Sequence, residues 1–270
     1  MQKKLFAMMM DIDKICKDND IEYYLIYGSA IGAVRHEGFI PWDDDLDIAM
    51  TDENYFKFLK VCEEELDKNK YFLQTDKTEK NYFLSFAKIR DITTTLINEN
   101  NVDVDMTYGI YIDIFPLVGV PKNKIKRFFL KVNRAFMLSS NVNIINNPIL
   151  KFVFKVLLKI FGKKRMLEYS TKNCFKYKCS ECDTWISICD GDGFELNEVE
   201  KKVMGKPKYV KFETSKLPIP NDHDTYLKKI YGDYMRIPSE EDIKKKEHTP
   251  YFLDLDLPYA EYKKRKEEND

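Results

Sequence analysis

Apolar side chains recur three and four positions apart near the start of the chain, and this spacing predicts a helix over residues 3–18. Segment 22–27 is rich in aromatic and β-branched residues, which favours a strand. The pattern changes at Gly28-Ser29, where we expect a tight turn before a short helix over 30–36. The expected order is therefore helix, strand, turn and helix.

A second strand is predicted after the loop 37–42, with acidic side chains along one of its faces. Alternation along a strand would turn three carboxylates in one direction and two apolar side chains toward the core. The carboxylates belong to Asp43, Asp45 and Asp47, and the apolar side chains to Leu46 and Ile48. We therefore expect a partly buried acidic strand rather than a solvated acidic loop.

Helical and strand patterns alternate up to about residue 120, and helices dominate after Pro121. The expected helices cover 52–68, 122–140 and 148–170, and the expected strands lie around 71–74, 82–90 and 109–115. In the first of these helices, Tyr55, Phe56, Leu59 and Cys62 are expected to face inward. These patterns predict an α/β protein with a core over 1–120, a mainly helical region over 121–205 and a C-terminal segment over 206–270 that packs back on the core.

Composition narrows the class of partner and the location. The 44 Lys and Arg nearly balance the 45 Asp and Glu, so the net charge of -1 predicts no general attraction to nucleic acid. Asp11 and Asp13 interrupt the N-terminal apolar stretch before it could form a signal peptide or a membrane span. We therefore expect a cytoplasmic protein whose six cysteines are reduced thiols or metal ligands and not a disulfide framework.

The acidic run is the first candidate for chemistry. Asp45 and Asp47 would repel each other unless a cation lay between them, and carboxylates together with substrate phosphates commonly hold Mg²⁺ or Mn²⁺. A third acid, Asp113, lies between two isoleucines on a predicted core strand, where an unpaired charge would be costly. It would complete the ion cluster, accept a proton from a hydroxyl group, or be satisfied by backbone N–H groups.

The Gly28-Ser29 turn supplies what phosphate binding requires. Backbone N–H groups at the start of a helix bind phosphate oxygens, and glycine permits a close approach of the ligand to the backbone. Together with the acidic pair, this turn predicts metal-dependent chemistry on a phosphate group.

The whole segment 27–48, YGSAIGAVRHEGFIPWDDDLDI, resembles the signature of the LicD family, to which fukutin and fukutin-related protein are related. Further family-like segments follow in order at 88–91 with 93–95, at 111–116, at 218–220, at 231–235 and at His248. The resemblance implies a nucleotidyltransferase (polymerase-β-like) mixed-sheet core with an appended mainly helical region. It also implies transfer of a phospho-alcohol from a CDP-activated donor to a glycan hydroxyl, with release of CMP.

The resemblance further implies roles for individual residues. The catalytic residues would be Asp45, Asp47 and Asp113, with Asp43 as an additional metal ligand. The substrate contacts would be Gly28, Ser29, Arg35, His36, Trp42, Asp43, Asp44, Lys88, Arg90 and His248. Two purely structural interpretations compete with these roles. Arg35 and His36 could cap their own short helix. Lys88 and Arg90 could form a solvent-exposed face of their strand.

Several functions remain open at this point. Phosphocholine from CDP-choline is the principal expectation for the transferred group, and lipopolysaccharide or teichoic acid for the acceptor. Ribitol phosphate or glycerol phosphate is an alternative, as is a nucleotidyltransferase that uses a nucleoside triphosphate on a small molecule. A non-catalytic binding protein is disfavoured, because the acids and the Gly-Ser turn occur together. A lipid-linked acceptor would place the enzyme at the inner face of the membrane.

Two other patterns have competing interpretations. In the part 148–164 of the helix predicted over 148–170, a lysine recurs at every fourth position among apolar residues. This pattern suits either a core helix with one solvated edge or a helix in a membrane interface. The second pattern is a group of four cysteines, Cys174, Cys179, Cys182 and Cys189. Their irregular spacing lacks a second close pair and disfavours a zinc site.

Overall fold

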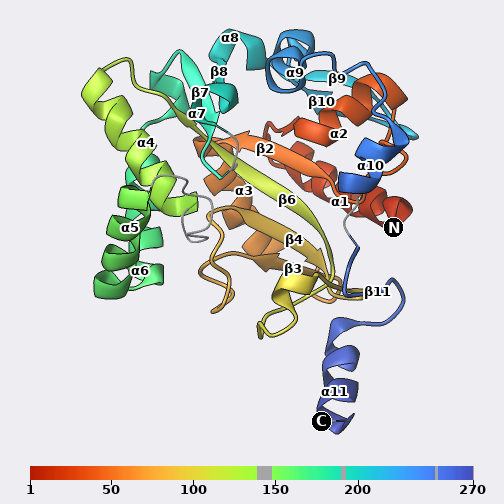
Figure 1. Cartoon of the computed structure of the whole chain (residues 1–270). Helices are drawn as coiled ribbons and strands as arrows, with labels where there is room; N and C mark the ends of the chain where they lie inside the picture. The colour runs from red at the N-terminus through yellow and green to blue at the C-terminus, as the bar shows by residue number, and fades with distance from the viewer. Residues whose placement is uncertain (139–147, 190–192, 247–248, 270) are drawn as a thin grey trace.

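A mixed β-sheet forms the centre of the protein in a computed structural model that describes residues 1–138, 148–189, 193–246 and 249–269 (Figure 1). Its strands run in the order β1-β2-β6-β4-β3, and β7 and β8 extend it from β6. The strands are β1 (Tyr24–Leu25), β2 (Asp47–Thr51), β3 (Tyr71–Gln74), β4 (Ala87–Asp91), β6 (Ile110–Gly119), β7 (Thr184–Ser187) and β8 (Glu198–Glu200). The sequence prediction of an α/β fold is confirmed.

Strand β6 is the long central strand and organises the sheet. It pairs in parallel with β2 and antiparallel with β4, and its last residues pair with β7. Two small sheets lie outside this one. They are the hairpin β9 (Lys208–Phe212) with β10 (Ser215–Ile219), and the pair β5 (Thr95–Ile97) with β11 (Phe252–Asp254).

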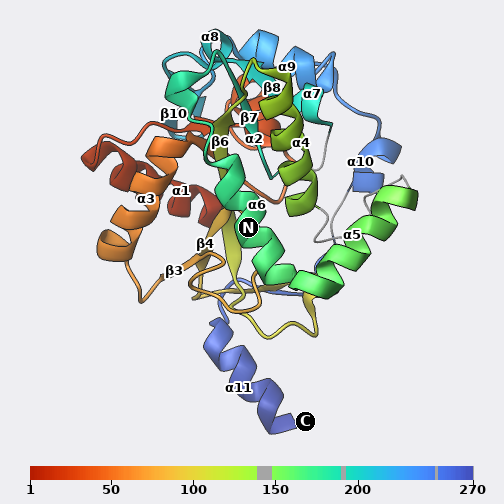
Figure 2. The ribbon, with the colours of Figure 1, turned by 90° about the vertical axis from the view of Figure 1, so that its left-hand side faces the viewer.

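Helices α1 (Gln2–Asp18) and α3 (Asp52–Glu65) cover one face of the sheet (Figures 1 and 2). Their apolar stripes pack against Ile48 of β2 and against Ile112 and Ile114 of β6, all fully buried. Because side chains alternate along a strand, the residues between these isoleucines point to the opposite face. This is why Asp47 and Asp113 lie on the face that α1 and α3 do not cover.

Helices α4 (Lys124–Leu138), α5 (Pro148–Phe161) and α6 (Lys163–Cys174) form a group at one side of the sheet (Figure 2). Leu130 and Met137 of α4 and Leu167 of α6 pack with Ile186 of β7 in a separate apolar cluster. The single helix expected over 148–170 is wrong, because Gly162 adopts a φ of 79° and separates α5 from α6.

The remaining elements connect the sheet to its periphery. The α-helices are α2 (Tyr27–Ile31), α7 (Phe194–Asn197), α8 (Lys201–Met204), α9 (His223–Tyr231), α10 (Glu240–Lys246) and α11 (Tyr259–Asn269), and shorter turns are the π-helix Gly32–His36 and the 3₁₀-helices Glu99–Asn101 and Cys179–Glu181. Helix α11 projects from the body of the molecule (Figure 1). In the part of the chain that the structure describes, no helix is both long and apolar enough to cross a bilayer.

Several element boundaries differ from the predicted ones. The strand expected over 22–27 contains only Tyr24–Leu25, because helix α2 begins at Tyr27 and includes Gly28-Ser29 in its first turn. The acidic strand begins at Asp47, and residues 43–46 form a loop. In α3, Phe56 is 44% exposed and Phe58 is the buried ring, because the inward stripe runs through positions 55, 58 and 62.

Candidate active site

The register of three neighbouring strands assembles the centre of the site. Asp47 of β2 lies opposite Asp113 of β6 in the parallel ladder, and Lys88 of β4 lies opposite Asp113 on the other side. The Lys88 ammonium donates a hydrogen bond to the Asp113 carboxylate, and both side chains are largely buried. The third acid that the sequence indicated is therefore brought directly beside the acidic pair.

The loop before β2 adds a second group of acids. The carboxylates of Asp43, Asp44 and Asp45 offer oxygen atoms that all lie within 4.8 Å of one another. The loop is held by Gln2 of α1, whose Nε2 donates to the carbonyl oxygens of Ile40 at 2.9 Å and of Asp43 at 2.8 Å. The expectation that strand alternation would bring Asp43 and Asp45 to one face is thus wrong, because both residues lie in a loop that places their carboxylates close together.

Burial and mutual repulsion make this cluster unfavourable for negative charge. Burial, followed by the charges of Asp43 and Asp113, raises the pKa of Asp45 to about 7. Burial, followed by the charges of Asp45 and Asp113, raises the pKa of Asp47 well above its usual range. Lys88 opposes both shifts, and burial lowers its own pKa. Among the described residues, the carboxylates at this site outnumber its ammonium groups.

An all-oxygen donor set of this kind fits a hard divalent cation such as Mg²⁺ or Mn²⁺. The carboxylates of Asp43, Asp44 and Asp45 form one group on the loop, and those of Asp47 and Asp113 come from the two adjacent strands β2 and β6. A cation bound there would offset both the burial and the repulsion that raise the pKa values of Asp45 and Asp47. The donor set and its electrostatics therefore both suit metal binding.

The start of helix α2 is attached to the first residue of β2. The Asp47 N–H donates to Ser29 Oγ at 2.8 Å, and the Ile26 N–H donates to the Asp47 carbonyl at 3.1 Å. Tyr27 adopts a φ of 49°, a conformation that is strained for a residue with a side chain. A Cβ on Gly28 would lie 2.9 Å from Asp43 Oδ2, so the absence of a side chain permits the acidic loop to approach this helix.

Arg35 joins the π-helical turn to the C-terminal segment. Its NH1 group donates to the carbonyl oxygens of Tyr234 at 2.7 Å and Arg236 at 3.1 Å, and its Nε donates to His36 Nε2 at 2.9 Å. The Trp42 ring lies 5.9 Å from the Arg35 guanidinium and 6.0 Å from the His36 ring. The hydrogen bonds of Arg35 therefore connect distant segments and do not cap its own helix.

Lys88 and Arg90 are buried, so the alternative of a solvent-exposed strand face is wrong. Arg90 donates from Nε to Gln74 Oε1 at 2.5 Å and from NH1 to the Gly109 carbonyl at 2.9 Å. The Tyr111 ring lies 4.9 Å from the Arg90 guanidinium and 3.6 Å from Lys88 Nζ. Arg90 thus has internal partners, whereas Lys88 faces the acids.

Aromatic rings that the sequence analysis did not single out line the neighbouring part of the same sheet face. Phe115 follows Asp113 by two positions on β6, and Phe86 stacks on it with ring centroids 4.6 Å apart. Tyr27 meets Phe115 edge-on at 5.9 Å. Only the alternation of β6 after Asp113 could have pointed to Phe115, because Tyr27 and Phe86 reach it from elsewhere in the chain.

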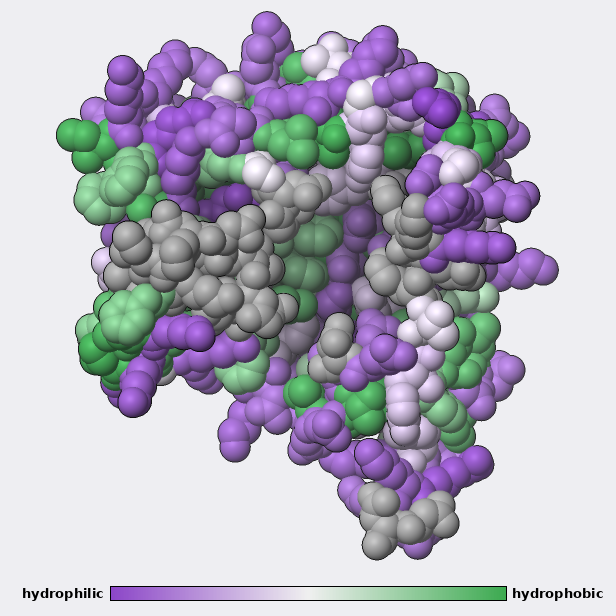
Figure 3. Space-filling view, in the orientation of Figure 1, coloured by the Kyte–Doolittle hydropathy of each residue, from purple (hydrophilic) through white to green (hydrophobic). Residues whose placement is uncertain are grey.

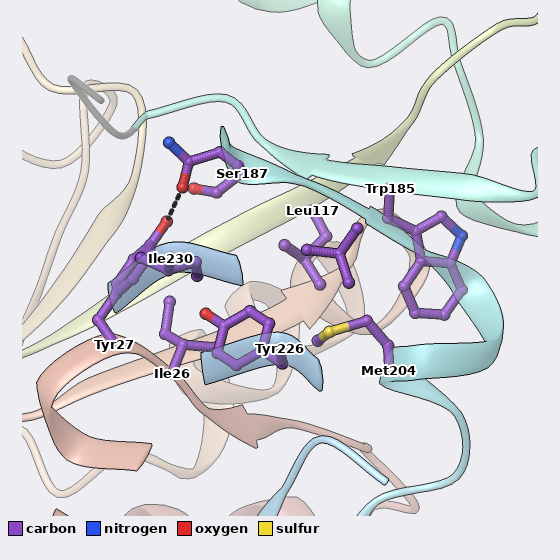
Figure 4. A pocket seen from close by; sticks show the side chains of 10 residues that line it. Ile26, Tyr27, Leu117, Trp185, Ser187, Met204, Tyr226 and Ile230 are labelled. Atoms are coloured by element: carbon purple, nitrogen blue, oxygen red, sulfur yellow. Dashed lines mark hydrogen bonds between the residues drawn. The ribbon is translucent and has the colours of Figure 1, made fainter. Parts of the chain in front are cut away.

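A small cavity behind Tyr27 does not serve as the substrate site. Its volume is ≈20 Å³, which is room for about one water molecule. Its lining is largely apolar (Figure 4). The Tyr27 hydroxyl at its edge donates a hydrogen bond to Asn197 Oδ1 at 3.2 Å. A larger hollow opens in the middle of the molecule over β6, with hydrophobic and hydrophilic atoms on its walls (Figure 3).

Two remaining expectations concern His248 and the cysteines. His248 lies outside the described residues. Cys174 and Cys179 are buried, and Cys182 and Cys189 are partly buried. Among the described residues, the one cluster of potential metal ligands is Asp43–Asp45, which contains no cysteine. The disfavoured zinc site therefore gains no support, and its absence stays a prediction.

Comparison with known proteins agrees with the resemblance noted in the sequence. The LicD/FKTN/FKRP nucleotidyltransferase domain matches residues 20–143. A lipopolysaccharide cholinephosphotransferase, LicD, from Haemophilus influenzae is 29% identical over 238 residues, which cover 85% of this chain and 88% of the relative. An uncharacterized protein of Rickettsia typhi is 40% identical over 57 residues (21% of this chain, 18% of the relative), and one of Rickettsia prowazekii is 44% identical over 50 residues (18% and 19%).

Proposed function

This chain belongs to the LicD family and is a phosphotransferase, and we propose that it moves phosphocholine from CDP-choline to a hydroxyl group of a cell-surface glycan, with CMP as the leaving group. The observation that carries the proposal is the facing pair Asp47 and Asp113, with the acids 43–45 beside it. Such a cluster suits a nucleotide donor that carries a diphosphate, because divalent cations bound by the carboxylates would also neutralise the negative charge of the diphosphate.

Asp43, Asp45, Asp47 and Asp113 are the proposed ligands of Mg²⁺ or Mn²⁺. When bound, the cation would neutralise the donor diphosphate and stabilise charge on the attacking and leaving oxygens. The acids occupy one loop and two paired strands, so their positions are set by the sheet and not by the ligand. Preorganisation of this kind lowers the cost of assembling the reacting groups.

The transfer step needs an acceptor for the hydroxyl proton. We assign this role to Asp113, because it lies between Asp47 and Lys88 in the strand register and its ion pair with Lys88 fixes its carboxylate. The acceptor oxygen forms a bond to the phosphorus distal to cytidine, the bond from that phosphorus to CMP breaks, and the proton passes to Asp113. Lys88 is the cation best placed to meet the phosphate charge.

The aromatic rings of Tyr27, Phe86 and Phe115, which we call the aromatic floor, support choline over ribitol or glycerol as the transferred alcohol. The ring of Phe115 contacts those of both Tyr27 and Phe86, and Phe115 lies two positions after Asp113 on β6. A quaternary ammonium group gains free energy from aromatic faces, whereas a polyol requires hydrogen-bonding groups. The neighbouring carboxylates add a further attraction for a cationic substituent, so we propose that the trimethylammonium group lies against these rings.

The proposal is tested by product analysis with Mg²⁺ present. The protein is incubated with CDP-choline, CDP-ribitol, CDP-glycerol or a nucleoside triphosphate, each with a lipopolysaccharide or teichoic-acid acceptor. We expect CMP from CDP-choline and phosphocholine on the glycan. Pyrophosphate release from a triphosphate would instead identify a nucleotidyltransferase, and CMP release from CDP-ribitol or CDP-glycerol alone would contradict the choice of choline.

A further inference from the structure

The helical region has an unusual charge for a protein that is nearly neutral overall. Residues 121–174 contain 13 of the 44 Lys and Arg but only one of the 45 Asp and Glu, Glu168. The rest of the chain therefore carries 31 basic and 44 acidic residues. In α4, Arg127 and Lys131 pair with Glu198 and Glu195, whereas α5 contains three lysines and no acidic residue, so the uncompensated positive charge of this region lies mainly on α5 and α6.

The same region exposes large apolar side chains. On α4, Ile125, Phe128 and Phe129 are more than half exposed, and on α5 Phe152 is 68% and Ile160 65% exposed. We call these residues, with Val156 and the exposed lysines beside them, the basic-apolar surface. Figure 3 shows hydrophobic atoms among hydrophilic ones at the edge of the molecule over α4 and α5.

These exposed side chains are not an inward stripe left without a partner. Helix α4 already packs inward through Leu130 and Met137, and α5 packs through Phe154, whose ring stacks on Phe136 at 3.9 Å. Phe152, Val156 and Ile160 recur every fourth residue and lie on the opposite side of α5 from Phe154. Each helix thus has one apolar stripe toward the protein and a second one toward the outside.

We propose that the basic-apolar surface docks on a bilayer that contains anionic phospholipids. Lys155 and Lys159 are exposed and lie along one side of the ridge of Phe152, Val156 and Ile160, which gives the outer face of α5 the charged and apolar halves of an interfacial helix. Lysine ammonium groups meet lipid phosphates, while the aromatic and aliphatic side chains enter the boundary with the acyl chains. The protein lies on the membrane and does not cross it through any described helix.

Other occupants fit these observations less well. A symmetric contact with a second copy would bring one basic surface against another and would be repulsive. A nucleic acid would use the lysines but would leave Phe152 and Ile160 in water. An anionic bilayer complements both the charge and the exposed apolar ridge, and α5 lies beside the open face of the sheet, as Figure 2 shows.

The test is sedimentation of the full chain with vesicles in the absence of any substrate, so it does not depend on the proposed reaction. The vesicles contain phosphatidylcholine alone, or phosphatidylcholine with about one-third phosphatidylglycerol. The apolar variant is Phe152→Ser with Ile160→Ser, and its control is Ile237→Ser with Tyr251→Ser, which removes equally exposed side chains elsewhere. The charge variant is Lys155→Glu with Lys159→Glu, and its control is Lys264→Glu with Lys266→Glu on α11.

We expect the wild type to bind the anionic vesicles and each surface variant to bind them at least roughly ten-fold more weakly, whereas both controls bind like the wild type. Unchanged melting temperatures would show that the variants fold. Three results would overturn the proposal: no binding of the wild type to anionic vesicles, loss in the charge variant alone with the apolar variant unaffected, or a wild-type dimer in light scattering that the apolar variant converts to a monomer.

Discussion

The central sheet and the helical region place their charged and apolar side chains in opposite ways. In the sheet, isoleucines of β2 and β6 are fully buried under α1 and α3, and the acids on the other face are held in a partly buried cluster. In α4 and α5, phenylalanines are exposed together with lysines. Charge is therefore gathered inward in the first region and spread outward in the second.

This difference between the two regions shows where exact side-chain positions are needed for the proposed functions. The carboxylates of Asp47 and Asp113 are useful only at a defined separation, and paired strands supply that separation. A bilayer has no fixed geometry to match, so α4 and α5 need only the right composition on one surface. Substitutions should accordingly have large, position-specific effects in the sheet and small, additive effects on the helices.

The largest effect is expected at the acid cluster. Asp47→Asn and Asp113→Asn should each lower the rate of CMP release by about 10³-fold or more, because an amide is a poor metal ligand and cannot accept the proton. Asp103→Asn, an exposed acid outside the cluster, is the matched control. Turnover is measured with CDP-choline and Mg²⁺. Near-wild-type rates in the Asp47 and Asp113 variants would show that these acids are not needed for the reaction.

Substitution of a phenylalanine should also lower the free energy of unfolding much more under the sheet than on the exposed face of the helical region. Phe58→Ala in α3 should lower the free energy of unfolding by about 3–5 kcal/mol, because a fully buried ring is replaced by a cavity. Phe152→Ala in α5 removes a ring that is 68% exposed and should change it by less than about 0.5 kcal/mol. Urea unfolding measures both, and equal losses would show that Phe152 is a core residue.

A smaller effect is expected from the aromatic floor beside Asp113. Phe86→Leu keeps an apolar side chain but removes the ring, and should lower kcat/KM for CDP-choline by about ten-fold. Phe128→Leu, an exposed ring on α4, should leave it unchanged. The inhibition constant of CMP, measured in competition with CDP-choline, is compared between Phe86→Leu and the wild type. If Phe86→Leu weakened CMP binding as much as CDP-choline use, the ring would contact cytidine and not choline.

The pH dependence of stability should be the most modest signature. Burial and neighbouring acids raise the pKa of Asp45 to about 7, above its value in the unfolded chain, so the folded protein holds a proton that the unfolded chain releases. Without divalent cations, the melting temperature should therefore fall as the pH rises from about 4, where the unfolded Asp45 loses its proton, to about 7. Mg²⁺ should reverse this loss, since it binds the folded state.

Asp45→Asn should flatten the same profile, because the amide cannot lose a proton. Asp20→Asn, on an exposed turn, is the matched control. Scanning fluorimetry with a chelator or with Mg²⁺ records the profiles, and a wild-type profile that is flat across this range would mean that burial and the neighbouring acids do not raise the pKa of Asp45.

Local patterns in the sequence were sufficient for several conclusions. The helix predicted over 3–18, which the structure has as Gln2–Asp18, the strand over 71–74 and the α/β class follow from the spacing of apolar residues. The run from Tyr27 to Ile48 was sufficient to indicate the LicD family, and the comparisons confirm it. Periodicity and short motifs report on residues close together in the chain, where one element sets their relative positions.

Only the tertiary structure decided how the site is assembled. Asp47 meets Asp113, and Asp113 meets Lys88, through hydrogen bonding between strands that are far apart in the chain. The burial of Arg90, the gathering of Asp43–Asp45 in a loop and the contact of Phe86 with Phe115 depend on how those strands and loops pack. A periodic pattern shows which face of an element a residue occupies, but strand register and packing determine what lies opposite it.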